Sequence, residues 1–243
     1  MWLTIFASHA FANETDSTTK RNAVEFVQDS SPEINAQSLF NRGRYKQAAV
    51  EFSALASSYK SSYGENSLKT LAVINRLAET YIKLGREDEA IQLNRRVLRV
   101  LSNSLQTVES QVLNAKVLSD IGWAYLDLSE PDNAKHFVWR AVYLRRKLLG
   151  RTHPDTLRSE HNLAAWYSAQ GQYKQALKVQ TTTANLLEKK LGASHPDVAT
   201  ALEEVANLYG RLYLYIDQIH WIKKALFIRE KSQGTEHPDY AYS

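Results

Sequence analysis

The chain has 243 residues, of which 44% are hydrophobic and 23% charged, a composition that suits a folded protein and excludes a wholly disordered one. The formal net charge of +4 is too small to indicate nucleic-acid binding, and the absence of cysteine excludes disulfides and thiolate metal sites. No stretch approaches the roughly 18 consecutive apolar residues of a membrane-spanning helix.

The first 31 residues differ in kind from the rest of the chain. Residues 1–12 read MWLTIFASHAFA, without Lys, Arg, Asp or Glu, and Ala10-Phe11-Ala12 fits the small-x-small pattern of a signal-peptide cleavage site. A basic region before the apolar stretch is missing, so a frayed terminus without function is the alternative. We interpret residues 1–12 as a signal-peptide remnant, which favours an exported location, periplasmic or secreted, over a cytoplasmic one. Residues 13–31 are polar and aperiodic, which predicts a disordered linker.

A constant spacing recurs through the remainder, residues 32–243. The tripeptide His-Pro-Asp begins at three positions that are 42 residues apart: His153, His195 and His237. The same offset separates three tyrosines: Tyr125, Tyr167 and Tyr209. Independent markers that keep one period indicate internal repeats, each of which is a small supersecondary unit.

Each unit contains two helices. In the most regular copy, Leu163 and Tyr167 are four residues apart and share one helical face. Gly171 ends that helix, and Ala176 begins the next at a close helix–helix contact. One such pair cannot bury its apolar face alone, so successive pairs must stack. We predict an all-α, right-handed superhelical solenoid of about five antiparallel helix pairs. They span residues 33–61, 67–102, 111–148, 154–190 and 196–232, with the start of another helix at 237–243.

These marks resemble the tetratricopeptide family, and the period of about 42 residues resembles its kinesin light chain subtype. Two segments carry the resemblance, Leu149 to Asp155 and Leu191 to Asp197, which both read Leu-Gly-x2-His-Pro-Asp. The first two pairs are less regular, because Asn66-Ser67-Leu68 replaces His-Pro-Asp and Leu39 replaces the tyrosine. The resemblance implies a non-catalytic scaffold whose partner is a protein or an extended peptide.

In this family the first helix of each pair lines a concave groove that binds the ligand. Carried onto this sequence, the groove positions are Asn75, Arg76, Glu79, Lys83, Asp120, Trp123, Arg158, His161, Asn162, Asn207 and Arg211. Asn162 matches the asparagine whose amide pairs with a bound peptide backbone in the family, and we expect it to face solvent together with Arg76. Trp123 is either an anchor for an apolar side chain or a filler of the seam between repeats.

No motif points to catalysis or to metal binding. The sequence has no glycine-rich phosphate loop, no His-Glu-x-x-His and no nucleophile elbow. His-Pro-Asp has a structural explanation, because proline and aspartate are both favoured in the first turn of a helix. Equivalent histidines in successive pairs lie about 10 Å apart, whereas zinc needs ligands at about 2 Å. We expect no enzyme, no metal and no cofactor.

The second helices of the pairs carry more Lys and Arg than Asp and Glu. Basic residues on them include Arg95, Arg96, Arg140, Arg145, Arg146, Lys189, Lys190, Lys223 and Lys224. We expect these helices to form a basic convex back, with Arg145 and Arg146 pointing away from a groove that is near neutral or mildly acidic. One alternative is therefore a nucleic-acid or anionic-membrane factor that acts through this back. Nucleic acid is the less expected partner, because interleaved aromatic residues are missing. A further alternative is the repeat portion of a larger enzyme or sensor.

Overall fold

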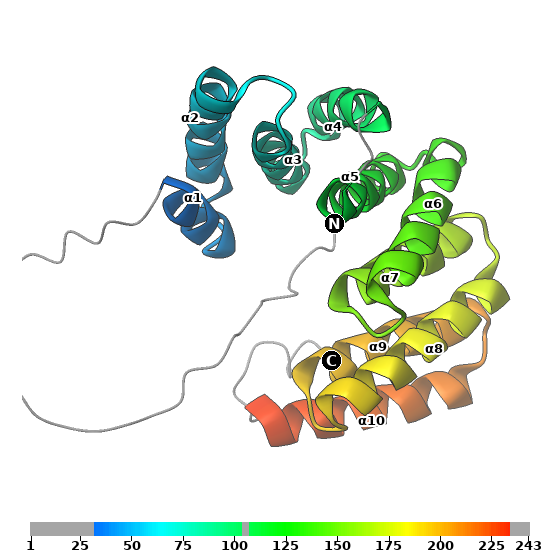
Figure 1. Cartoon of the computed structure of the whole chain (residues 1–243). Helices are drawn as coiled ribbons and strands as arrows, with labels where there is room; N and C mark the ends of the chain where they lie inside the picture. Colours follow the sequence, from blue (N-terminus) through cyan, green and yellow to red (C-terminus); the bar gives the residue numbers. More distant parts are fainter. Residues whose placement is uncertain (1–31, 104–106, 234–243) are drawn as a thin grey trace, which may run out of the picture.

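The computed structural model describes residues 32–103 and 107–233, which form ten helices and no strand (Figure 1). In chain order the helices are α1 (Pro32–Asn41), α2 (Tyr45–Tyr63), α3 (Leu68–Lys83), α4 (Glu87–Ser102), α5 (Val108–Asp127), α6 (Pro131–Leu149), α7 (Pro154–Ala169), α8 (Tyr173–Leu191), α9 (Pro196–Arg211) and α10 (Tyr215–Gln233). The signal-peptide and linker interpretations for residues 1–31, and the helix start at 237–243, lie outside the described residues.

The helices follow one another around an arc (Figure 1). Each helix packs against the next along the chain, and α5 also contacts α3 and α7. In Figure 1, α3, α5 and α7 lie on the inner side of the arc, while α4, α6 and α8 lie on its outer side. The predicted all-α solenoid of antiparallel helix pairs is thereby confirmed. No helix within the described ranges is long and apolar enough to cross a membrane.

The His-Pro-Asp motifs act as helix caps. His153 precedes α7, and its Nδ1 accepts a hydrogen bond from the backbone N–H of Asp155 at 3.2 Å. His195 caps α9 in the same way, with Nδ1 at 3.1 Å from the N–H of Asp197. A side-chain acceptor at this position satisfies one of the backbone donors that the first helical turn leaves unpaired. The structural interpretation of the motif is therefore sufficient for both described copies.

The turn inside each pair requires one residue with a left-handed backbone. Gly85 and Gly171 adopt φ values of +70° and +69° there, a conformation that glycine takes without steric cost. The N–H of the following residue, Arg86 or Gln172, then donates to the carbonyl of Tyr81 or Tyr167. This return hydrogen bond closes the end of α3 and of α7 and reverses the chain direction.

The third pair begins earlier than the sequence analysis expected. Helix α5 starts at Val108 rather than at residue 111, because Thr107 and Ser110 form a reciprocal capping box. The Ser110 N–H donates to Thr107 Oγ1 at 3.1 Å, and the Thr107 N–H donates to Ser110 Oγ at 3.2 Å. Both donors at the helix start are satisfied by this exchange.

The apolar core is distributed along the seams between helices. A first cluster joins α3 to α7 and includes Ile121 and Val138; a second joins α7 to α10 and includes Leu202. A third cluster, around Phe52 and Val73, joins α1, α2 and α3. Neighbouring pairs therefore share the apolar side chains that hold them together.

Candidate functional site

A cluster of charged side chains lies where α3, α5 and α7 come together. Its centre is the Glu79 carboxylate of α3, and one of its oxygens lies 2.8 Å from Lys116 Nζ on α5 and 3.0 Å from Arg76 Nη1. The second carboxylate oxygen lies 3.7 Å from Arg158 Nη1 on α7. Each of three consecutive helix pairs therefore places one cation beside the same carboxylate.

The charges in this cluster control its protonation. Burial by itself raises the pKa of Glu79, but the positive charges of Lys116, Arg158 and Arg76 lower it by more than burial raises it. The net pKa of Glu79 lies well below the ordinary range of a glutamate. Burial lowers the pKa of Arg158, but the carboxylates of Asp120, Glu79 and Asp155 outweigh that effect and raise it. Glu79 and Arg158 thus favour each other's ionised form.

A second acidic group, Asp120 of α5, binds to the cluster through Lys116. Asp120 Oδ2 accepts a hydrogen bond from Lys116 Nζ at 3.0 Å and one from the buried Asn75 amide at 2.8 Å. Asn75 also donates to Asn94 Oδ1 of α4 at 3.0 Å. This network ties α3, α4 and α5 together and fixes the position of the Lys116 ammonium.

The cations and the carboxylates differ in how far they reach into solvent. The side chains of Arg76 and Arg158 are 44% and 36% exposed, whereas those of Glu79 and Asp120 are 14% and 10% exposed. Asp155, whose Oδ1 lies 3.8 Å from Arg158 Nη2, is itself 45% exposed, so both signs of charge reach the inner surface. We expected a groove near neutral or mildly acidic, and the cluster carries both signs of charge, with Arg76, Lys116 and Arg158 beside Glu79, Asp120 and Asp155.

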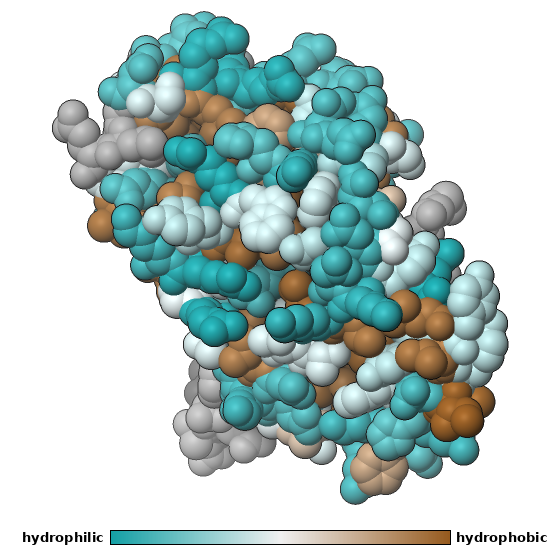
Figure 2. Space-filling model, turned by 90° about the vertical axis from the view of Figure 1, so that its right-hand side faces the viewer, coloured by the Kyte–Doolittle hydropathy of each residue, from teal (hydrophilic) through white to brown (hydrophobic). Residues whose placement is uncertain are grey.

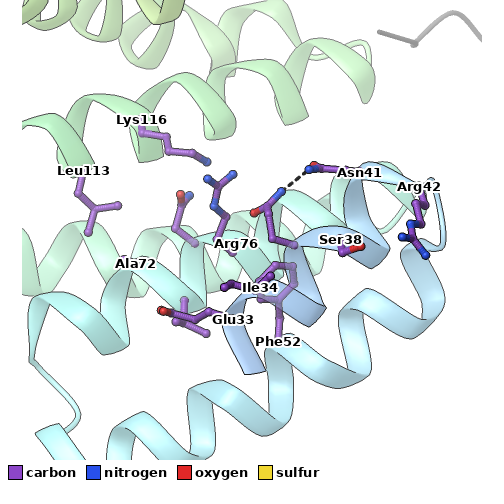
Figure 3. Close-up of a pocket in the computed structure, with 13 residues that line it drawn as sticks. Glu33, Ile34, Ser38, Asn41, Arg42, Phe52, Ala72, Arg76, Leu113 and Lys116 are labelled. Carbon is purple, nitrogen blue, oxygen red and sulfur yellow. Dashed lines mark hydrogen bonds between the residues drawn. The ribbon is translucent and has the colours of Figure 1, made fainter. Parts of the chain in front are cut away.

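A cavity lined by residues of α1, α2, α3 and α5 adjoins the cluster (Figure 3). It has a volume of about 720 Å³, and its apolar wall includes Ile34, Phe52, Val73 and Leu113. Figure 3 shows the Lys116 and Arg76 side chains on the side of the cavity away from Phe52. The cavity can hold an apolar side chain within reach of two cations, which suits a ligand with both kinds of group.

The structure divides the expected groove residues into exposed and buried groups. Arg76, Asn207 and Arg211 are exposed, and Glu79, Lys83, Trp123, Arg158 and His161 are half-buried. Burial lowers the pKa of Lys83, although Glu79, Asp127 and Asp120 counteract this. Asn75, Asp120 and Asn162 are buried. Asn207 and Arg211 lie on α9, beyond the cluster on α3, α5 and α7.

Asn162 corrects the expectation that it faces solvent. Its amide is 6% exposed and donates to the Ser119 carbonyl at 3.3 Å and to Ser119 Oγ at 3.2 Å. The amide therefore joins α7 to α5 instead of presenting its donor to a ligand. The sequence pattern located the residue on the correct helix but could not show that Ser119 satisfies it.

Trp123 lies in the seam between α5 and α7. Its ring stacks on the His161 ring with centroids 6.1 Å apart, and its indole Nε1 is buried without a hydrogen-bond partner among the described residues. It also packs against the apolar cluster that joins α3 to α7. This placement supports the seam interpretation of Trp123 rather than that of a freely exposed anchor.

Arg145 corrects the expectation for the convex back. Arg145 is 2% exposed, and its Nη1 donates to the Asp155 carbonyl at 2.7 Å and to Ser159 Oγ at 2.8 Å. Burial lowers the pKa of Arg145 to about 10. Arg146 Nε donates to the buried Glu160 at 2.8 Å. Arg145 is therefore part of the seam between α6 and α7, whereas Arg146, whose side chain is 41% exposed, pairs with Glu160 and stays accessible on α6.

Two features of the candidate site were missed in the sequence. Lys116 lies one helical turn before Asp120, so its place on the same face of α5 followed from the spacing. The cavity wall formed by α1 had no such signal, because the first pair lacks the regular markers. Within the described ranges, no group of three or more His, Asp or Glu side chains is arranged to hold a metal ion.

Comparisons with known proteins agree with this architecture. The sequence model of the tetratricopeptide repeat matches residues 33–103 and 113–189. No curated protein matches the chain. Among solved structures, the chain is similar to a putative kinesin light chain of Podospora anserina with nearly identical repeats, at 21% identity and a TM-score of 0.69. That alignment covers 84% of this chain and 95% of the other.

Two other solved structures show the same fold. BtubC (BKLC) from P. vanneervenii has a TM-score of 0.69 at 14% identity, covering 85% of this chain and 81% of the other. A Rap protein in complex with the competence and sporulation factor has a TM-score of 0.64 at 13% identity, covering 87% of this chain and 61% of the other. At such identities the likeness concerns the fold alone.

Proposed function

Because the chain belongs to the tetratricopeptide repeat family, we propose that it is a non-catalytic scaffold that binds a protein or peptide along the inner surface of α3, α5 and α7. The observation that carries this proposal is the arrangement of Arg76, Lys116 and Arg158 around Glu79. It gives a surface built from three helix pairs, as a ligand in extended conformation requires.

The proposed ligand carries carboxylates. Arg76 and Arg158 have the more exposed side chains among the cations of the cluster, and a guanidinium can bind a carboxylate through two parallel hydrogen bonds. Glu79 and Asp120 stay beneath them, where they hold Lys116 and the two arginines in position. The ligand therefore meets cations that are already ordered, which reduces the entropy lost on binding.

The cavity beside α1 adds a second element of recognition. Its wall of Ile34, Phe52, Val73 and Leu113 suits one apolar side chain, while Arg76 and Lys116 line the same cavity. We therefore expect peptides in which an apolar residue lies close to Asp or Glu. Burying one such side chain contributes about 1.5–3 kcal/mol.

Selection from a random peptide library on the purified full chain tests this function. The proposal predicts enrichment of peptides that combine Asp or Glu with an apolar residue, and their mutual competition for one site. A parallel selection on the Arg76→Glu variant should lose these peptides, whereas one on Arg140→Glu, an exposed residue of α6, should keep them. Enrichment of basic peptides, or of the same peptides on Arg76→Glu, would contradict it.

A further inference from the structure

The turn between α9 and α10 carries a concentrated apolar surface. Five large side chains are exposed there, by 77% for Tyr213, 46% for Leu214, 56% for Tyr215, 87% for Ile216 and 52% for Ile219. At about 200 Å² per side chain, these fractions amount to roughly 600 Å² of surface. That area is at the upper end of the largest apolar patch that a typical monomer exposes. We name these five residues the α9–α10 patch.

The patch belongs to the last described pair. In Figure 2, hydrophobic side chains gather in the lower half of the face shown. The view is turned about the vertical axis from Figure 1, so this is the height at which α8, α9 and α10 lie in Figure 1. The equivalent turns of the second, third and fourth pairs read Gly85-Arg86, Ser129-Glu130 and Gly171-Gln172, where this one reads Tyr213-Leu214. The repeat fold therefore does not require apolar residues at this turn.

Tyr213 shows the contrast most clearly. It adopts a φ of +60° at the position where Gly85 and Gly171 have φ values of +70° and +69°. A tyrosine in this left-handed conformation is strained, whereas a glycine is not. Its side chain is largely in solvent, and its ring packs edge-on against the neighbouring Tyr215 ring, with centroids 6.3 Å apart. The strained residue therefore lies in an exposed apolar surface and not in the core.

We propose that the α9–α10 patch is a self-association surface that meets the same patch of a second copy across a two-fold axis. The area agrees with this occupant, since a stable interface buries about 800 Å² on each partner, part of it a polar rim. The patch occurs once among the described turns, so pairing with itself closes a dimer instead of building a filament. The exposed Asp217 in its midst disfavours an anionic lipid surface as the occupant.

Sedimentation velocity of the full chain, from about 1 to about 100 µM, tests the proposal. We expect a monomer–dimer equilibrium that Ile216→Glu with Ile219→Glu shifts to monomer, with a dissociation constant raised at least tenfold. Val108→Glu, which places the same charge on an exposed valine of α5, should leave the dimer intact. Tyr213→Gly should weaken the dimer and yet raise the melting temperature measured at monomeric concentrations, because it removes strain.

Three results would overturn the proposal. The first is a chain that stays monomeric at the highest concentration, and the second is a dimer that forms equally well with Ile216→Glu and Ile219→Glu. The third is flotation with phosphatidylserine vesicles that the same double substitution abolishes, which would make lipid the occupant. The groove on α3, α5 and α7 is separate, so peptide binding by these variants reports independently on the proposed function.

Discussion

Lys116 Nζ donates a hydrogen bond of 2.8 Å to Glu79 Oε2 and thereby joins α5 to α3 across the seam of two helix pairs. The same ammonium lies 3.0 Å from Asp120, so that one lysine neutralises parts of two recessed carboxylates. The two carboxylates are therefore satisfied by partners within the chain, and Arg76 and Arg158, which also pair with Glu79, have the more exposed side chains among those partners.

Replacing Glu79 by Gln should destabilise the fold by about 2 kcal/mol at neutral pH, the usual range for a charged hydrogen bond. The pKa of Glu79 is lowered in the folded chain, so the ionised form stabilises the fold at pH values above the pKa of the unfolded chain, about 4.3. This contribution is lost as the pH falls through the folded pKa.

Denaturant unfolding of both proteins across pH checks this prediction. The difference in unfolding free energy between the wild type and Glu79→Gln should be largest near pH 7 and should shrink steadily below about pH 4. A difference that stays constant between pH 7 and pH 2 would show that the charge of Glu79 does not stabilise the fold.

Reversing the charge of Arg145 should destabilise the fold by about 3–5 kcal/mol, because a carboxylate there would be buried beside the Asp155 carbonyl without a donor of its own. Arg140→Glu is the matched control: Arg140 is exposed on the same helix, and its reversal should cost less than about 0.5 kcal/mol. Thermal unfolding of the two variants compares them directly. Equal melting temperatures would mean that Arg145 is not part of the α6–α7 seam.

Asn162→Ala should lower stability by about 1–2 kcal/mol, since it leaves the buried Ser119 carbonyl and hydroxyl without the amide that now bonds them. Peptide affinity, measured at a temperature where the variant remains folded, should change by less than threefold. A variant with unchanged stability and strongly reduced affinity would return Asn162 to the ligand-binding role that the sequence suggested.

The fold could be predicted from the sequence because its markers are local. The turn backbone favours glycine at Gly85 and Gly171, and these glycines mark the ends of helices in the sequence. A proline that follows a capping histidine, as Pro154 follows His153, marks the start of a helix. The start of α5 was placed late because Thr107 and Ser110 form their capping box through side-chain geometry rather than through the repeat pattern.

The site could be predicted only in part. Spacing placed Arg76, Glu79 and Arg158 on inner helices, but it carries no information about which side chain satisfies another. Asn162 and Arg145 looked exposed from their helix positions, and each is buried because a neighbouring pair supplies its partner: Ser119 for the amide, and the Asp155 carbonyl with Ser159 for the guanidinium. Contacts between pairs depend on how the solenoid curves, which the repeat period alone does not determine.

The dissociation constant of one selected acidic peptide for the full chain, compared between Arg76→Glu and Arg140→Glu, tests the central claim most directly. The account predicts that Arg76→Glu weakens binding by about 1–3 kcal/mol, or roughly 5-fold to 150-fold, whereas Arg140→Glu changes it less than twofold. Loss of binding in Arg140→Glu with full affinity retained in Arg76→Glu would contradict it and would place the ligand on the basic back.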